Sequence, residues 1–150
     1  MFSLDLMPSA PRIRHSCFAF VFAFALSCAA ADTPSGIRFD GLYCAPDDEG
    51  FLPPVTSYLR FYPDGVVVSV AARDTPQEAA KWIRRDDRFS SQGRYSFVKR
   101  AVAFSVTNVN GAVDYSGTLD GDQLAVSWDA RNGKKGKDTY KFLRLALPTQ

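Results

Sequence analysis

The amino-acid sequence predicts an all-β fold, an antiparallel up-and-down barrel of about eight strands with one short helix. Three observations lead to this prediction. From residue 37 onward, apolar and polar residues alternate with a period of two, which is typical of strands that bury one face. Turn sequences separate the alternating stretches, notably Pro63-Asp64-Gly65, Asn110-Gly111 and Asp120-Gly121. Only one stretch has a helical period instead.

The expected strands follow one another closely, which fits hairpin connections between sequence neighbours. Their approximate ranges are 37–44, 58–62, 66–70, 93–98, 101–106, 113–119, 124–128 and 139–145, with a polar loop at 131–138 before the last strand. Asn-Gly and Asp-Gly pairs favour hairpins because a type I′ turn needs positive φ at both central residues. Strands joined mainly to their neighbours can close into a barrel, which removes the sheet edges.

A single helix is expected between the third and fourth strands, over about residues 75–87. Thr75, Pro76 and Glu78 match a helix start: an N-cap, a proline in the first turn and the glutamate of a capping box. The apolar stripe that follows with helical spacing consists of Ala79, Trp82 and Ile83. We expect Trp82 to pack over one end of the barrel as a plug.

The apolar face of each expected strand should point into the barrel. The opposite faces carry Arg60, Arg94, Asp114, Gln123 and Lys141. An outer-membrane barrel has an apolar outer face and strands of about 9–11 residues, longer than those expected here. The predicted inward set includes nine aromatic residues: Tyr43, Phe61, Tyr95, Phe97, Phe104, Tyr115, Trp128, Tyr140 and Phe142. Rings of this size favour a filled interior, or a small cavity, over a roomy one.

Short motifs along the chain resemble those of lipocalin-like (calycin-type) small barrels in bacterial secreted proteins and lipoproteins. They are Gly41-Leu42-Tyr43, the stretch 59–65 that ends in Asp-Gly, and Trp82 followed by Gly93-Arg94-Tyr95. The sequence departs from lipocalins in having Tyr43 where they have Trp, and in placing the helix within the strand order rather than after the last strand. The resemblance covers about residues 37–145 and implies a calycin-type barrel.

The first 31 residues have the features of a secretory signal peptide. Arg12 and Arg14 precede an apolar run over 17–26, which is too short for a membrane-spanning helix of about 20 residues. Small residues up to Ala31 then offer a cleavage site. Cleavage there would leave residues 32–150 as a single domain with a short flexible N-terminal segment, 32–36, and no transmembrane segment. We expect an exported protein, periplasmic or extracellular.

An alternative processing site lies within the same segment. Ala25-Leu26-Ser27-Cys28 is similar to a bacterial lipobox, in which the cysteine becomes lipidated, although such motifs usually begin with Leu. Cleavage before Cys28 would anchor the domain to a membrane through lipid, whereas cleavage after Ala31 would discard this cysteine. Both outcomes stay open at the level of the sequence.

The residues left after export exclude several kinds of chemistry. The chain has one histidine, His15, and it lies within the expected signal peptide, so no Ser–His or Cys–His nucleophile pair is expected. For the same reason we expect no zinc or other metal site, and the absence of a Gly-rich phosphate loop predicts no cofactor. A net charge of +2 gives no reason to expect nucleic acid as a partner.

Three further features have both a structural and a functional interpretation. Cys44 is either a small buried hydrophobe or a thiol that cross-links a dimer. The acidic step Asp47-Asp48-Glu49 lacks the spacing of a calcium loop and is interpreted as a solvated loop. Lys134, Lys135 and Lys137 fall in the expected loop 131–138 and are interpreted as a solvated turn rather than a lipid-binding patch.

These observations favour a non-enzymatic barrel in the cell envelope that binds a small apolar ligand or an envelope lipid. The expected barrel lining consists of Tyr43, Phe61, Tyr95, Phe104, Tyr115, Trp128 and Tyr140. The alternative is a protein-interaction or inhibitor barrel with a filled core, which would act on an envelope protein through its loops. A third hypothesis, a carboxylate- and tyrosine-based hydrolase or isomerase, requires at least two of Asp40, Asp114 and Tyr115 to converge in one cleft.

Overall fold

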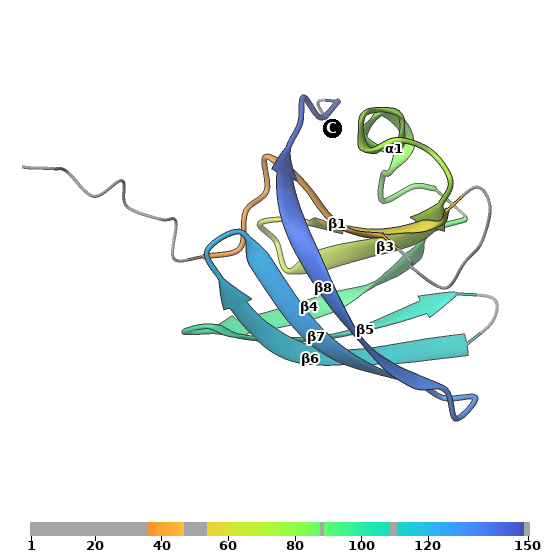
Figure 1. Ribbon diagram of the computed structural model, residues 1–150, viewed down its shortest axis with the longest axis vertical. Helices are drawn as coiled ribbons and strands as arrows, with labels where there is room; N and C mark the ends of the chain where they lie inside the picture. The colour runs from red at the N-terminus through yellow and green to blue at the C-terminus, as the bar shows by residue number, and fades with distance from the viewer. Residues whose placement is uncertain (1–35, 47–53, 88, 109–110, 149–150) are drawn as a thin grey trace, which may run out of the picture. The chain divides into compact units, whose positions relative to one another are not determined.

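A computed structural model describes residues 36–46, 54–87, 89–108 and 111–148 (Figure 1). The expected signal peptide 1–31, with Cys28 and Ala31, lies outside the described residues, as do nearly all of the expected segment 32–36 and the acidic step 47–49. The predictions about export, processing and lipidation therefore stay predictions.

The described residues form a closed antiparallel barrel of eight strands in simple sequence order, with one short helix (Figure 1). The elements are β1 (Gly41–Pro46), β2 (Thr56–Phe61), β3 (Val66–Ala72), α1 (Pro76–Trp82), β4 (Ser91–Val98), β5 (Ala101–Asn108), β6 (Gly111–Asp120), β7 (Gln123–Ala130) and β8 (Lys135–Arg144). Each strand pairs with its sequence neighbours, and β1 pairs with β8 to close the sheet. The predicted fold class is confirmed, including the position of the helix between β3 and β4.

The strand ends differ from the predicted ones in the second half of the chain. β6 and β8 each have ten residues, which is longer than expected. The predicted loop 131–138 is wrong beyond residue 134, because the β7–β8 ladder already pairs Asp129 with Lys135 and Val126 with Asp138. Lys135 and Lys137 are therefore strand residues on the outer face. The charged and glycine residues of this stretch are typical of a loop, which explains the wrong prediction.

The glycines at the turns have the positive φ that was predicted, but Asp120 does not, so Asp120-Gly121 does not form the expected type I′ pair. Gly65, Gly111 and Gly121 have φ values of 86°, 120° and 58°, in the region that favours glycine. Around the first of these turns, the backbone N–H of Tyr62 donates to the carbonyl of Val66 at 2.9 Å. Asn110 lies outside the described residues. Glycine placement thus set three of the hairpin connections that keep the strands in sequence order.

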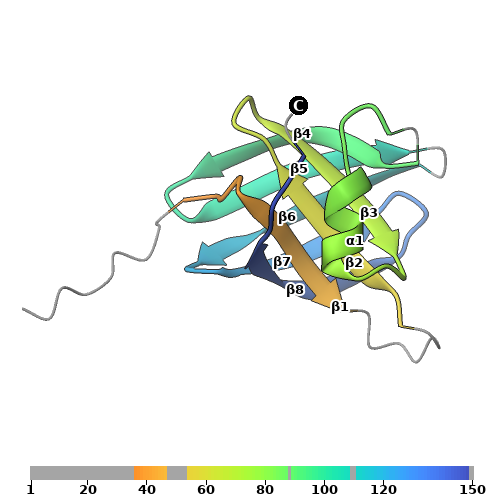
Figure 2. The ribbon, with the colours of Figure 1, turned by 90° about the horizontal axis from the view of Figure 1, so that it is seen from above.

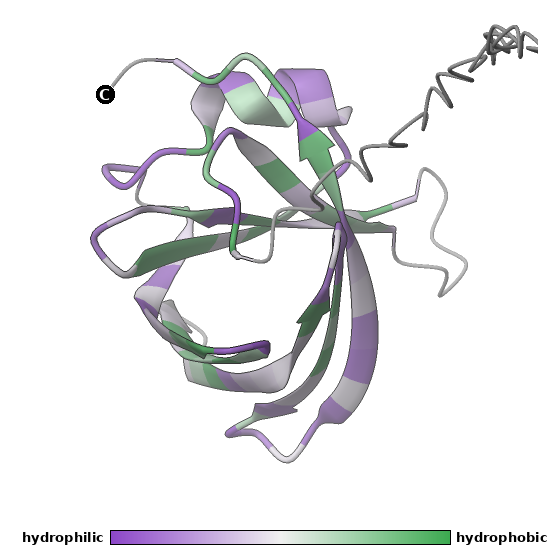
Figure 3. Cartoon of the chain, turned by 90° about the vertical axis from the view of Figure 1, so that its left-hand side faces the viewer, coloured by the Kyte–Doolittle hydropathy of each residue, from purple (hydrophilic) through white to green (hydrophobic). Residues whose placement is uncertain are grey.

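The barrel interior is packed mainly with aromatic and branched apolar side chains. Eight of the nine predicted inward aromatics lie in this core or pack against it, the exception being Trp128. The Phe61 ring makes edge-to-face contacts with Tyr43, Tyr95 and Phe104, with centroids 5.4, 5.1 and 5.7 Å apart. Figure 3 shows the apolar and polar bands alternating along the strands. The predicted alternation is therefore correct for the middle of the barrel.

Helix α1 lies against the outer surface of the β1–β3 wall, not over a barrel end (Figures 1 and 2). The capping box is present as predicted, with Thr75 and Glu78 bonded to each other's backbone N–H. The helix ends at Trp82 rather than near residue 87. A second apolar cluster joins the helix to the wall and comprises Leu42, Tyr58, Tyr62, Val68, Val70, Ala79, Ala80 and Ile83.

The predicted plug role of Trp82 is therefore wrong. Its indole is half-buried at the edge of the outer cluster and donates from Nε1 to Asp74 Oδ2 at 2.9 Å. The physical reason is that β3 is apolar on both faces, because Val66, Val67 and Val68 are consecutive. A strand with two apolar faces needs a cover on its outer side, and α1 provides it. Beneath the helix, the buried Arg60 donates from Nη1 to the Ile83 carbonyl at 2.7 Å.

Candidate functional site

The two ends of the barrel are built from different side chains, and we name them after one residue of each. At the Arg38 end, the guanidinium of Arg38 lies 4.0 Å from the centroid of the Phe142 ring and forms ion pairs with Asp40 at 3.3 Å and Asp122 at 3.0 Å. The backbone N–H of Arg38 donates to the Tyr43 hydroxyl at 3.1 Å. These contacts place a cationic side chain across this end of the core.

Apolar side chains fill the barrel behind Arg38. Phe61, Leu119, Leu124 and Phe142 are each at most 5% exposed. The hydrogen bond from the Arg38 guanidinium is the main cause that lowers the pKa of Asp40 below its ordinary value. This end is therefore covered and electrostatically paired.

At the Asp138 end, the inward-facing positions carry small and polar residues. Asp138 precedes Tyr140 and Phe142 at a spacing of two on β8, so it points into the barrel with them. By the same alternation, Ser57 on β2 and Ser69 on β3 also face inward. Asp138, Ser57 and Ser69 are half-buried, whereas Tyr140, one step deeper, is 1% exposed. Solvent thus reaches inward-facing polar groups at this end.

Hydroxyl groups from different strands lie near one another at the Asp138 end. The Tyr115 hydroxyl of β6 lies near Ser69, and the Tyr140 hydroxyl of β8 lies near Ser57. Burial is the main cause that raises the pKa of both tyrosines, and the nearby charge of Asp138 raises each further. Both hydroxyls therefore stay protonated at neutral pH. They can donate and accept hydrogen bonds, but they are poorly suited to act as bases or nucleophiles.

Trp128 completes this end on the β7 side. It pairs with Gly136 across the β7–β8 ladder, and a methyl group on Gly136 would overlap the indole ring. The missing side chain lets the indole lie across β8. Trp128 is half-buried and is not part of the barrel core that was predicted to include it. Trp128 lies close to the end of the β7–β8 ladder, two residues before β7 ends.

The structure separates the seven predicted lining residues into two groups. Tyr115, Trp128 and Tyr140 come together at the Asp138 end. The others, Tyr43, Phe61, Tyr95 and Phe104, pack in the core toward the Arg38 end, and the Tyr95 hydroxyl donates to the Tyr62 carbonyl at 2.9 Å. The stacked rings of Phe104 and Tyr115, with centroids 4.5 Å apart, connect the two groups.

Asp138, Ser57 and Ser69 were missing from the predicted lining. A signal for Asp138 was present, because it stands two residues before Tyr140, which was itself predicted to face inward. The predicted loop 131–138 hid that signal. Ser57 precedes the expected start of the second strand, and Ser69 is small and polar, so neither has the apolar signal that predicts an inward position.

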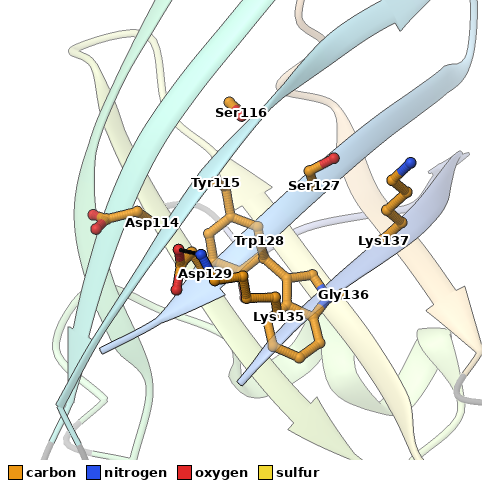
Figure 4. Close-up of a pocket in the computed structure, with 9 residues that line it drawn as sticks. All are labelled: Asp114, Tyr115, Ser116, Ser127, Trp128, Asp129, Lys135, Gly136 and Lys137. Carbon is orange, nitrogen blue, oxygen red and sulfur yellow. Dashed lines mark ion pairs between the residues drawn. The ribbon is translucent and has the colours of Figure 1, made fainter. Parts of the chain in front are cut away.

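A separate pocket of about 480 Å³ opens on the outer surface of the β6–β8 wall near the same end (Figure 4). Its sides are formed by the exposed residues Asp114, Ser116, Ser127, Asp129, Lys135 and Lys137, and the intervening Tyr115, Trp128 and Gly136 form its floor. Lys135 and Asp129 form an ion pair at 2.6 Å across it. Opposite charges are thus already paired within this surface pocket.

The arrangement of carboxylates bears on the hydrolase or isomerase hypothesis. Asp114 and Tyr115 both border the outer pocket, but as consecutive strand residues they point to opposite faces of β6 (Figure 4). Asp40 lies at the Arg38 end, in ion pairs with Arg38 and Arg144. The functional groups of these three residues do not converge.

A second hollow of about 650 Å³ lies beside the end of α1. It is lined by Trp82, Arg84, Asp86, Asp87 and Phe89. Phe89 is 79% exposed, the largest exposure among the large apolar residues in the described part of the chain. Arg84 and Asp86 form an ion pair at 3.6 Å, so the charges here partly neutralise each other.

Cys44 packs against the outer apolar cluster, and burial raises the pKa of its thiol to about 11. Within the described ranges, no group of three or more His, Cys, Asp or Glu residues is arranged to hold a metal ion. The helical part of the described chain contains no segment long and apolar enough to cross a membrane.

Comparisons of the chain with models of protein families, with curated proteins and with solved structures gave no match. The described fold therefore defines the class, a closed eight-stranded antiparallel barrel with a helix on its outer wall.

Proposed function

We propose that this chain is an exported, lipocalin-like barrel that binds a small ligand at its Asp138 end. The observation that carries the proposal is the contrast between the two ends. Arg38 and its partners cover one end, whereas at the other end inward-facing polar and aromatic residues keep part of their surface exposed. Binding sites typically combine apolar walls with a few polar groups that fix orientation.

The packed middle of the barrel limits the size of the ligand. Phe61 and Phe104 fill the space between the two ends, and their rings are 5.7 Å apart. A long acyl chain would need those rings to move. A compact molecule with an apolar body therefore fits better than a full lipid among the envelope ligands expected from the sequence.

The groups at the Asp138 end support binding rather than catalysis. Tyr115 and Tyr140 have raised pKa values and remain neutral, and Asp138 is the single carboxylate on the inner wall in the described strands. General acid–base catalysis usually needs a second group tuned to the opposite role. We therefore propose a non-enzymatic function.

Native mass spectrometry of the protein purified from its own host tests this function. We expect a fraction of molecules to carry a small organic adduct that is released on unfolding. Trp128→Ala, which shortens one wall of the proposed site, should reduce that fraction strongly. Trp82→Ala, on the outer wall, is the matched control and should leave it unchanged. No adduct, together with no binding from a panel of small aromatic compounds, would contradict the proposal.

Export and anchoring are separate parts of the proposal. The intact mass of the mature protein distinguishes the two processing sites. Cleavage after Ala31 leaves a chain that begins at Asp32. Lipidation at Cys28 instead leaves a longer chain that carries a diacylglyceryl group. In that case globomycin should block the processing. A full-length product retained in the cytoplasm would contradict export.

A second function, binding of a protein partner, is favoured by one observation. Phe89 exposes most of its ring beside the hollow near Trp82. Exposed aromatic residues are common anchors of interfaces. If this surface binds an envelope protein, Phe89→Ser should abolish in-cell cross-linking to it, whereas Val98→Ser, at a similarly exposed position on β4, should not. Equal cross-linking by both variants would eliminate this surface as the interface.

A further inference from the structure

We propose that the Arg38 end of the barrel contacts an anionic lipid membrane, with the tip of the β4–β5 hairpin lying against the lipid headgroups. The tip comprises Val98, Lys99 and Arg100, where β4 ends and β5 begins. This inference rests on the lipid-anchored form of the proposed export, because a lipid at Cys28 brings the barrel to a membrane surface. It does not depend on the ligand proposed for the Asp138 end.

Exposed apolar side chains are concentrated at the Arg38 end. Four large apolar residues are exposed in the described part of the chain, and three of them lie on the rim of this end: Phe39, Val98 and Leu143. Leu143 pairs with Leu42 where β1 begins. Val98 forms the last pair of the β4–β5 ladder and is 67% exposed. Apolar surface of this kind is buried favourably at the boundary between headgroups and acyl chains.

The backbone of the hairpin tip has an unfavourable conformation for the residue it carries. Lys99 has a φ of 59°, and no other residue except glycine has a positive φ in the described ranges. Glycine or asparagine adopts this conformation at lower cost, and the turn at Gly65 uses glycine. The tip thus keeps a cationic side chain where local turn chemistry favours an uncharged residue. Strained positions of this kind are typical of functional surfaces.

The charge of this end is complementary to anionic lipid. Its carboxylates are each ion-paired with an arginine: Asp40, Asp64, Asp120 and Asp122. Lys99 forms no ion pair with a described residue, and Arg100 keeps its side chain 63% exposed while it pairs with Asp120. The tip therefore carries an excess of positive charge. Anionic headgroups attract each such residue weakly, so an anchor is needed to hold the tip close to them.

The N-terminal segment joins the barrel beside this hairpin. Figures 1 and 2 show the chain entering the barrel at the same end as the β4–β5 connection. A methyl group on Gly36, the first described residue, would lie 4.0 Å from the Phe97 ring, one position before Val98. A lipid attached to the N-terminal segment therefore pulls on the molecule next to the tip.

The length of that segment favours contact through the Arg38 end. Gly36 comes eight residues after Cys28, a span of at most about 29 Å. The two ends of the barrel are about 25 Å apart, since its ten-residue strands are about 34 Å long and barrel strands tilt by about 40°. The Asp138 end could touch the membrane only with the segment almost fully extended, which costs chain entropy. The proposed orientation turns the Asp138 end away from the membrane.

Photo-cross-linking of the full-length lipidated protein tests this contact. The protein is purified from its own host and reconstituted into vesicles of equal amounts of phosphatidylcholine and phosphatidylglycerol, with a trace of a diazirine-bearing phospholipid. Peptide mapping should place the lipid cross-links at residues 98–100. The double variant Val98→Ser, Lys99→Gly should reduce them at least about fivefold, the effect expected for one basic residue at an anionic surface. Vesicles of phosphatidylcholine alone should also reduce them.

The matched control is Lys134→Gly. Lys134 lies in the β7–β8 connection at the opposite end, so this variant removes the same charge from an exposed turn. It should leave the cross-links at 98–100 within about twofold. Glycine suits the positive φ of residue 99, and thermal unfolding should confirm that the double variant folds. Protein cross-linking through Phe89 is a separate measurement, which Val98→Ser should leave unchanged.

The outcomes separate this contact from the proposed function. Cross-links spread over both ends, or unchanged in the double variant, overturn the membrane contact but leave export and ligand binding standing. Links between the tips of two protein molecules, in place of lipid, identify a second copy as the occupant and also overturn it. A mature chain that begins at Asp32 overturns both the anchored form and this inference. If the double variant does not fold, the positions of the wild-type cross-links decide.

Discussion

The two ends of this barrel are formed by the same eight strands but differ in which charged residues they carry and in what surrounds those residues. At the Arg38 end, a cation lies over an aromatic ring and is paired with two carboxylates. At the Asp138 end, a carboxylate faces inward among hydroxyls and partly exposed rings. The first arrangement satisfies its charges within the protein and stabilises the fold. The second leaves part of its hydroxyl and aromatic surface exposed to solvent, and this is why we propose ligand binding there.

The largest effect on stability is expected for the aromatic core, which separates the two ends. Phe61→Ala should lower the free energy of unfolding by about 3–5 kcal/mol, because it removes the ring that contacts Tyr43, Tyr95 and Phe104. Denaturant titration measures this loss. Phe89→Ala removes an equally large but exposed ring and should change stability by less than about 0.5 kcal/mol. Similar losses in both would mean that the core is not as packed as described.

At the Asp138 end, Gly136→Ala should destabilise the protein by about 1–3 kcal/mol, because the added methyl group overlaps the Trp128 indole. The same variant should weaken ligand binding, since the indole must move. Thermal unfolding and titration with the panel of small aromatic compounds measure the two effects. Combining it with Trp128→Leu should restore much of the stability but not the binding. A double variant no more stable than Gly136→Ala would show that the indole is not the cause.

At the Arg38 end, Arg38→Met should cost about 1–2 kcal/mol, since it keeps the packing length but loses the cation–π contact and the ion pairs. Ligand binding at the other end should be unchanged. Arg94→Met, at an exposed strand position, provides the control for stability. If Arg38→Met changed the affinities for the small aromatic compounds as much as the stability, the two ends would not be independent.

The smallest effect is a pH dependence at the Arg38 end. The pKa of Asp40 is lower in the folded protein than its ordinary value of 3.8, so its pairing stabilises the fold above about pH 4 and is lost as the pH falls through the folded pKa. Denaturation midpoints measured between pH 3 and pH 6 should therefore fall less steeply at the acid end in Arg38→Met than in the wild type. Identical slopes would show that this pairing does not contribute.

Much of the barrel could be predicted because its signals are local. Alternation placed Tyr43, Phe61 and Phe104 inside, and glycines at the turns set the order of the strands. The helix start was also readable, because capping depends on residues three positions apart. The surface against which the helix packs could not be predicted in the same way. Whether Trp82 covers a barrel end or a barrel wall depends on which outer face remains apolar once the strands are paired.

The candidate site was predicted in part. Tyr115, Trp128 and Tyr140 were expected to line the barrel, but the sequence did not separate them from the rings packed toward the other end. Asp138 was assigned to a loop because charged and glycine residues surround it. Strand pairing with β7 overrides that local preference and turns the carboxylate inward.

By itself, the sequence determined the closed antiparallel barrel, the capped helix and the class of residue that fills the core. These features depend on a period of two, on turn chemistry and on caps, all of which act within a few residues. Only the tertiary structure decided that α1 covers an outer wall, that Arg38 covers one end, and that Asp138 meets Tyr115 and Tyr140 at the other. Arg38 with Phe142, and Asp138 with Tyr115, come from segments that are not neighbours in the chain, so their positions depend on the register and closure of the whole sheet.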